Sequence, residues 1–219
     1  MEFQLDTWLE LFTHRLLDTF PGRVIFLGIQ GSRGRGESKP DSDIDMVVVL
    51  DQVGLEDLRA YRELLRTLPH GGLTCGFFCG REELLHWPRY DLLQLVLDTK
   101  PLYGGLENLL PAFSPADTAA AVHIGAANLY HAACHCYLHG DDPAGCLASL
   151  AKSAFFLLRL DHYRRSGCYA ATMAELKRLY PETGLDDSDC DACYQALIRW
   201  TSSLMGPCPR HEPAAPPAG

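Results

Sequence analysis

The spacing of hydrophobic positions changes between helical and strand-like along the first half of the chain. Apolar residues recur every three to four positions in three segments and predict helices there: 4–19, 55–68 and, broken near Pro88, 81–99. Three short apolar runs predict buried strands: 23–30, 42–50 and 73–79. The polar, glycine-rich stretch 31–40 predicts a connection between the first two strands.

The second half of the chain carries only helical spacing. Two long alanine- and leucine-rich helices are predicted at 119–138 and 144–165, followed by shorter ones at 172–179 and 189–205. Short connections between such helices favour a bundle of antiparallel neighbours. We therefore expect an α/β (α+β) domain with a small mixed sheet over residues 1–110 and an all-α helical bundle over 115–206. The proline- and alanine-rich segment 207–219 predicts a disordered tail.

Composition and charge narrow the partners. The 219 residues are 47% hydrophobic and 21% charged, with a net charge of −9, which is typical of a globular acidic protein. A large nucleic-acid footprint needs a basic face, so nucleic acid is not expected as a partner. No apolar run approaches the ~18 residues of a membrane span, and the acidic start does not fit a signal peptide. We expect a cytoplasmic protein without membrane attachment, and a homodimer stays open.

The connection after the first strand has the chemistry of a phosphate-binding loop. Gly31 lets a phosphate approach the backbone N–H groups, and Ser32 adds a hydroxyl donor. Arg33 and Arg35 offer planar guanidinium groups that match phosphate oxygens. The loop differs from a P-loop, because Lys39 is followed by proline rather than by serine or threonine. A merely flexible loop is the plainer alternative.

Two carboxylates follow this loop at the head of the next strand. Asp43 and Asp45 stand two positions apart, so their side chains are expected on one face of the strand. Convergent carboxylate oxygens beside a triphosphate suit Mg²⁺, and two such ions can serve a phosphoryl-type transfer. Either motif alone is common, but their combination between two apolar strands predicts a metal-assisted nucleotide site.

The combined motif resembles that of a known superfamily. Gly31-Ser32 with Gly36, followed by Ser42-Asp43-Ile44-Asp45, is similar to the signature of the DNA polymerase β-like nucleotidyltransferases, and the chain looks closest to their minimal and kanamycin-type members. The resemblance covers residues ~20–100 in detail and the helical half in architecture alone. It implies that Asp43 and Asp45 are catalytic and hold two Mg²⁺ ions. It also implies that the triphosphate is held by Gly31 and Ser32, with Arg33, Arg35 and Ser42 beside them.

One departure from the superfamily opens a second hypothesis. The third carboxylate of the family normally comes from the next strand, but the run 73–79 contains no Asp or Glu. The nearest acids along the chain are Glu82, Glu83 and Asp91. The first hypothesis is Mg²⁺-dependent transfer of a nucleoside monophosphate from a nucleoside triphosphate to a hydroxyl of an unknown small-molecule or protein acceptor. The alternative is a catalytically weakened nucleotide-binding or antitoxin-like interaction protein.

Histidine and cysteine spacings in the helical half raise further candidates. His131, His135 and His139 recur every four residues and are expected on one helical face, either as a metal site or acceptor-binding row or as partly buried side chains. Cys190 and Cys193 have the spacing of a metal or redox pair, but no second pair accompanies them. Reduced, buried thiols are the plainer expectation for the cysteines.

Overall fold

A computed structural model describes residues 4–170, 172–180 and 189–206 of the chain. It divides into two compact units, Met1–Asp117 and Thr118–Gly219. The expected division into domains of residues 1–110 and 115–206 stays a prediction, and the segment 207–219, expected as a tail, lies outside the described residues.

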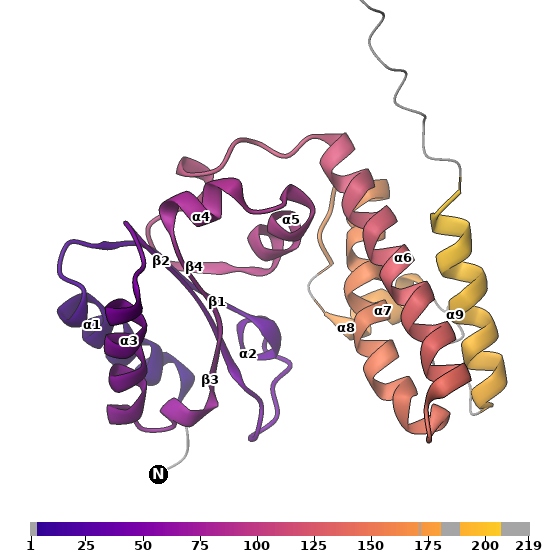
Figure 1. The fold of residues 1–219 in the computed structure, drawn as a ribbon, viewed down its shortest axis with the longest axis horizontal. Helices are drawn as coiled ribbons and strands as arrows, with labels where there is room; N and C mark the ends of the chain where they lie inside the picture. Colours follow the sequence, from indigo (N-terminus) through magenta and orange to yellow (C-terminus); the bar gives the residue numbers. More distant parts are fainter. Residues whose placement is uncertain (1–3, 171, 181–188, 207–219) are drawn as a thin grey trace, which may run out of the picture. The chain divides into compact units, whose positions relative to one another are not determined.

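The first unit is a four-stranded sheet with short helices. Its helices are α1 (Leu5–Thr19), α2 (Gly31–Arg35), α3 (Leu55–Thr67), α4 (Arg81–His86) and α5 (Arg89–Asp98), with 3₁₀ turns at Gly71–Leu73 and Leu106–Asn108. Its strands are β1 (Val24–Gln30), β2 (Ile44–Leu50), β3 (Thr74–Gly80) and β4 (Lys100–Tyr103). The sheet order is β3-β2-β1-β4, with β2 and β3 parallel and the other pairs antiparallel. The expected small mixed sheet is confirmed (Figure 1).

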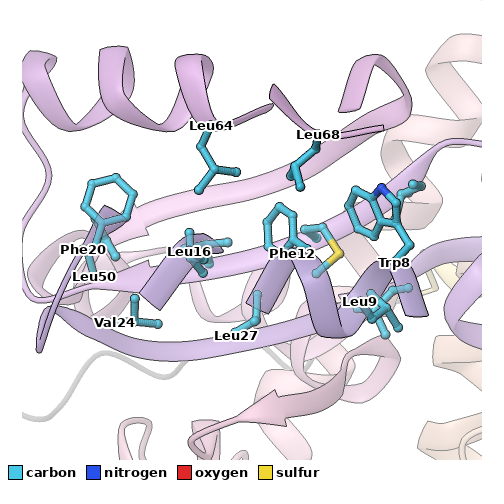
Figure 2. Packing of buried hydrophobic residues seen from close by; sticks show 14 residues of the cluster. Trp8, Leu9, Phe12, Leu16, Phe20, Val24, Leu27, Leu50, Leu64 and Leu68 are labelled. Atoms are coloured by element: carbon cyan, nitrogen blue, oxygen red, sulfur yellow. The ribbon is translucent and has the colours of Figure 1, made fainter. Parts of the chain in front are cut away.

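Helices cover both faces of this sheet. On one face, Phe12 and Leu16 of α1 and Leu64 of α3 pack against the even-numbered residues of β2. Figure 2 shows Leu64 of α3, and Leu68 just after its end, beside the aromatic and aliphatic side chains of α1. On the other face, the odd-numbered Val47 and Val49 pack with residues of α4 and α5. The alternation of β2 follows from the two-residue period of a strand, and it places Asp45 on the face covered by α4 and α5.

Two elements of the first unit differ from the sequence-based expectation. The segment Gly31–Arg35, expected as an irregular connection, forms the single short helix α2. This segment has two glycines, which give it a low helix propensity, and it has no large apolar residue whose spacing could indicate a helix. The strand β4 was not predicted, because it contains Pro101 and is exposed along its whole length. An exposed four-residue edge strand shows neither alternation nor an apolar run.

The second unit contains the predicted helices. They are α6 (Pro115–His139, which begins in the first unit), α7 (Pro143–Ser166), α8 (Met173–Leu179) and α9 (Cys190–Leu204). Asp142 caps α7 by accepting a hydrogen bond from the backbone N–H of Gly145, and Gly167 ends it in the left-handed region. The side chains of Phe155, Leu158 and Leu176 form part of the unit's core. The expected all-helical second half is confirmed within the described residues.

The helix α7 is long and apolar enough to cross a membrane by length and composition, with a mean hydropathy of 1.2 over its best window. A core helix of a bundle passes the same test. Residues Phe155, Leu158 and Arg159 of this helix are buried inside the second unit. The finding is therefore weak evidence for a membrane span.

Candidate active site

The pairing of β1 with β2 brings the glycine loop against an aspartate. In this antiparallel pair, Gln30 stands opposite Asp45, so Gly31 follows directly beside that carboxylate. Gly31 has a φ of 72°, and a Cβ placed on it would lie 1.9 Å from Oδ2 of Asp45. Glycine is thus required here both by the backbone and by the neighbouring carboxylate. Residues separated along the sequence therefore lie side by side at this end of the sheet.

Asp43 lies just outside the strand. The ladder of β2 begins at Ile44, so Asp43 is exposed in the preceding loop while Asp45 is half-buried within the strand. Strand pairing therefore fixes the face of Asp45 only. That Asp43 shares this face stays a prediction. Both carboxylates remain at the end of β2 that adjoins Gly31.

Arg33 supports the loop from inside. Its side chain is buried, and its Nε and Nη2 donate to the carbonyl oxygen of Ser42 at 3.0 and 2.7 Å. Nη2 also donates to the carbonyl of Pro40 at 3.1 Å. The hydroxyl of Ser42 accepts from the backbone N–H of Lys39 at 2.8 Å and closes a turn. These contacts give Arg33 and Ser42 a role in fixing the loop before Asp43, and the expected contact with phosphate stays a prediction for both.

Arg35 is held between two carboxylates. Its Nη1 donates to Oδ2 of Asp98 at 2.7 Å and its Nε to Oε2 of Glu37 at 3.1 Å. The side chains of Arg35 and Asp98 are only 10% and 8% exposed. Oδ2 of Asp98 also accepts a long hydrogen bond of 3.4 Å from the backbone N–H of Gly31. The expected binding of phosphate by Arg35 stays a prediction. A phosphate would have to share or replace the contacts that Arg35 already makes with these two acids.

Asp98 is the site residue that the sequence did not suggest. It ends α5, and the chain then enters β4, whose Lys100 pairs with Ile29 of β1. This pairing brings Asp98 against Gly31, next to Asp45. Because β4 carries no apolar alternation, no pattern in the sequence indicated that this acid reaches the site.

The acids considered from the sequence lie elsewhere. In the parallel pair of β2 and β3, Asp45 stands opposite Cys75, whereas Gly80 stands opposite Leu50. Glu82 and Glu83 follow Gly80 in α4, so they lie roughly five residues, or about 16 Å, along the strands from Asp45. Asp91 precedes Asp98 by seven residues of α5, which is roughly 10 Å of helix. β3 places an exposed cysteine, not a carboxylate, beside Asp45.

The donor set fits a divalent cation only in part. Of the described residues, no group of three or more His, Cys, Asp or Glu side chains is arranged to hold a metal ion. Asp43 and Asp45 supply carboxylate oxygens, the ligands that Mg²⁺ takes in combination with water and substrate phosphates. The pair suits an ion that is completed by the nucleotide, and it does not by itself form a site for two ions.

The histidine row of α6 exists but stands alone. The rings of His131, His135 and His139 are exposed and follow one another at centroid distances of 6.0 and 5.1 Å. On α9, Cys193 is buried and Cys190 is partly exposed. Neither set belongs to a three-ligand cluster within the described part of the chain, so a metal role for them gains no support.

Part of the first unit is similar to a described family of domains. Residues 11–93 match the family model described as a nucleotidyltransferase domain. The resemblance of this segment to the DNA polymerase β-like nucleotidyltransferase superfamily is therefore confirmed. The first unit carries a nucleotidyltransferase domain.

A solved structure is similar to most of the chain. It is the spectinomycin adenyltransferase AAD(9) from Enterococcus faecialis, crystallised with ATP and spectinomycin. The TM-score is 0.53 and the sequence identity is 16%, over 91% of this chain and 98% of that chain. This likeness shows a shared fold, with a nucleotidyltransferase domain followed by a helical part. Among curated proteins, none matches the sequence significantly.

Proposed function

We propose that the chain is a Mg²⁺-dependent nucleotidyltransferase that moves a nucleoside monophosphate from a nucleoside triphosphate to a hydroxyl of a small-molecule acceptor. The observation that carries the proposal is the position of Gly31 directly against the carboxylate of Asp45. A loop that can take phosphate and a carboxylate that can take a cation then serve the same nucleotide. ATP and a small-molecule acceptor are favoured by the fold of the spectinomycin adenyltransferase, which was solved with both kinds of ligand.

The charges at this end of the sheet support the need for a cation. The carboxylates near the loop are those of Asp43, Asp45, Asp98 and Glu37. The loop also carries Asp41 and Lys39, and two guanidinium groups lie among the carboxylates, of which that of Arg33 is bonded to carbonyl oxygens. A triphosphate brought into this surplus of negative charge is repelled unless a cation accompanies it. Mg²⁺ held by Asp43 and Asp45 would supply that neutralisation and would polarise the phosphate oxygens.

The residues of the chain divide the remaining tasks. The backbone of Gly31 and Ser32 would bind the triphosphate, and Arg33 would keep the loop folded through the Ser42 carbonyl. We assign no residue as the base that receives the acceptor proton. A second cation would require a ligand beyond the two aspartates, and we place it outside the proposal. A cytoplasmic location, a protein acceptor and a homodimer stay predictions.

A specific observation favours the alternative of a weakened enzyme. The strand β3, from which the superfamily normally supplies its third carboxylate, contains no acid and holds Cys75 beside Asp45. Two-metal transfer needs enough anionic oxygen for both ions and a proton acceptor. A protein that binds nucleotide but transfers slowly, or serves as an interaction partner, is the second candidate function.

One experiment separates the two functions. The full chain is incubated with each radiolabelled nucleoside triphosphate and Mg²⁺, with aminocyclitol-type alcohols as acceptors, and pyrophosphate release and label transfer are followed. Release that depends on acceptor and Mg²⁺ supports the transferase. Binding of the nucleotide without pyrophosphate release, whether or not an acceptor is added, supports the weakened enzyme. Absence of both binding and release contradicts both.

A further inference from the structure

The carboxylate of Asp98 occupies two groups that a phosphate would also use. Its Oδ2 accepts from the guanidinium of Arg35 at 2.7 Å and from the backbone N–H of Gly31 at 3.4 Å. Guanidinium and amide N–H groups donate in the same way to phosphate oxygens as to carboxylate oxygens. The structure thus holds an internal anion against the loop that is proposed to bind the triphosphate.

This carboxylate is fixed in place by its surroundings. Asp98 and Arg35 are both at most 10% exposed, so water screens their interaction weakly. The next residue, Thr99, donates from its hydroxyl to the carbonyl of Leu95 at 2.5 Å and ends α5, and Lys100 then pairs with β1. The backbone around Asp98 is therefore anchored in the sheet, and moving its charge away from Gly31 has a free-energy cost.

We propose that Asp98 is a specificity-determining residue that competes with the triphosphate for Arg35 and Gly31, and so restricts binding to nucleotides complexed with a divalent cation. The inference rests on the proposed nucleotidyltransferase function. A free triphosphate meets Asp98 beside Asp45 and Asp43, and all three repel it. A triphosphate that carries a cation brings less negative charge and compensates the two other aspartates, so it can displace Asp98 from the amide.

The alternative role, a third metal ligand, fits the observations less well. The described residues contain no cluster of three metal-ligating side chains, so Asp43, Asp45 and Asp98 do not converge on one point. The oxygen of Asp98 that faces the loop is already bonded to a guanidinium. Metal coordination would have to replace this charge-assisted hydrogen bond with a contact near the positive charge of Arg35.

The test measures binding to the full chain by calorimetry with two probes, ATP and inorganic tripolyphosphate. Each probe is titrated with excess Mg²⁺ and, separately, with a chelator, into the wild type and Asp98→Asn. Removing one negative charge beside the polyphosphate is expected to tighten binding roughly tenfold in the chelator and less with Mg²⁺. The ratio of the two dissociation constants therefore falls in the variant.

Matched variants separate this effect from a general one. Asp91→Asn removes the same charge from an exposed position of the same helix and is expected to leave both constants within twofold of the wild type. Asp98→Glu keeps the charge and should retain the preference for the cation complex. Arg35→Gln combined with Asp98→Asn should gain less than Asp98→Asn alone, because Arg35 is one of the two groups released. Thermal unfolding confirms that each variant is folded, and Asp98→Ser replaces Asp98→Asn if the latter is not.

The outcomes are distinct. If folded Asp98→Asn binds both probes with unchanged or lower affinity, the proposed competition is overturned. If its affinity is lower only in the presence of Mg²⁺, the result assigns Asp98 to the metal. Tighter binding of tripolyphosphate by the variant, with no binding of ATP to either protein, supports competition at an anion site and contradicts the proposed nucleotide function. Lack of binding of either probe to either protein contradicts both.

Discussion

The two ends of the β1–β2 pair carry similar arginine clusters with different neighbours. Arg23, just before β1, donates to Asp51 at 3.0 Å and to Asp57 at 2.6 Å. Arg35, in the helix after β1, donates to two carboxylates at 3.1 and 2.7 Å. The side chain of Arg23 is 30% exposed and that of Arg35 is 10% exposed. Ion pairs of nearly equal length therefore lie in different surroundings.

The neighbours explain why only one end is proposed as a site. At the Arg23 end, Asp57 also accepts from the backbone N–H of Gly54 at 2.9 Å and so caps α3. Its charge is used to begin a helix. At the other end, Asp98 contacts the amide of Gly31, and Asp45 lies against the same glycine. An ion pair alone does not mark a site, whereas a loop glycine with two carboxylates against it brings a backbone amide and anionic oxygens together.

The largest effect is expected for Asp45, at the end of the strand pair that carries the candidate site. Asp45→Asn removes a proposed cation ligand, so we expect pyrophosphate release to fall on the order of a hundredfold or more. Asp51→Asn changes the same side chain at the opposite end of the strand pair and is expected to keep activity within twofold. Steady-state pyrophosphate release with saturating MgATP measures both. Equal losses in the two variants would show that the end of the sheet near Gly31 has no special role.

Two glycines, one at each end of β1, allow the same two ends to be compared by a matched substitution. Gly22 and Gly31 flank β1 and both have a φ of 72°. A Cβ on Gly22 would meet nothing within 4 Å, whereas one on Gly31 would meet the Asp45 carboxylate. Gly22→Ala should lose roughly 1–2 kcal/mol of unfolding free energy through backbone strain alone. Gly31→Ala should lose at least as much and also displace Asp45.

Denaturant unfolding and nucleotide binding together test this pair. We expect both variants to be destabilised and only Gly31→Ala to lose binding of MgATP. If Gly22→Ala weakens MgATP binding to the same extent, the effect comes from the sheet as a whole and not from the contact with Asp45.

Another variant introduces a carboxylate into the strand beside Asp45. Cys75 is exposed and stands opposite Asp45, so an acid introduced there faces the same side of the sheet. If Mg²⁺ binding limits transfer, Cys75→Asp should raise pyrophosphate release severalfold, and Cys75→Ser, which adds a hydroxyl without charge, should not. A decrease in release by Cys75→Asp, with the fold retained, would argue that the site works without a carboxylate from β3.

The sequence indicated the parts of the candidate site that have a local pattern. The glycine at position 31 and the aspartate at 45 were both recognised, because they flank apolar strands whose type and bounds are predictable. The partners of Arg33 and Arg35 were not predictable, since guanidinium groups suit phosphates, carbonyls and carboxylates alike. Asp98 reaches Gly31 only through the pairing of β4 with β1, and that strand has no hydrophobic pattern. Long-range pairing of an exposed edge strand is decided by the whole fold.

The smallest expected effect concerns the Arg23 end and its response to acid. The hydrogen bond from Arg23 lowers the pKa of the Asp57 carboxyl, and the Gly54 amide lowers it further. Because the folded-state pKa is lowered, the resulting stabilisation is present above the ordinary aspartate value of about 4 and is lost as the pH falls through the folded-state pKa. Asp57→Asn should therefore lower the urea midpoint at pH 7 and have a shrinking effect below about pH 4. Because the side chains of Arg23 and Asp57 both remain partly exposed to water, the change is expected to be small. Arg23→Gln should show the same pH dependence, and nucleotide binding should stay unchanged in both variants. If Asp57→Asn shifts the urea midpoint equally at pH 7 and pH 3, the helix cap, and not the charge, provides the stabilisation at this end.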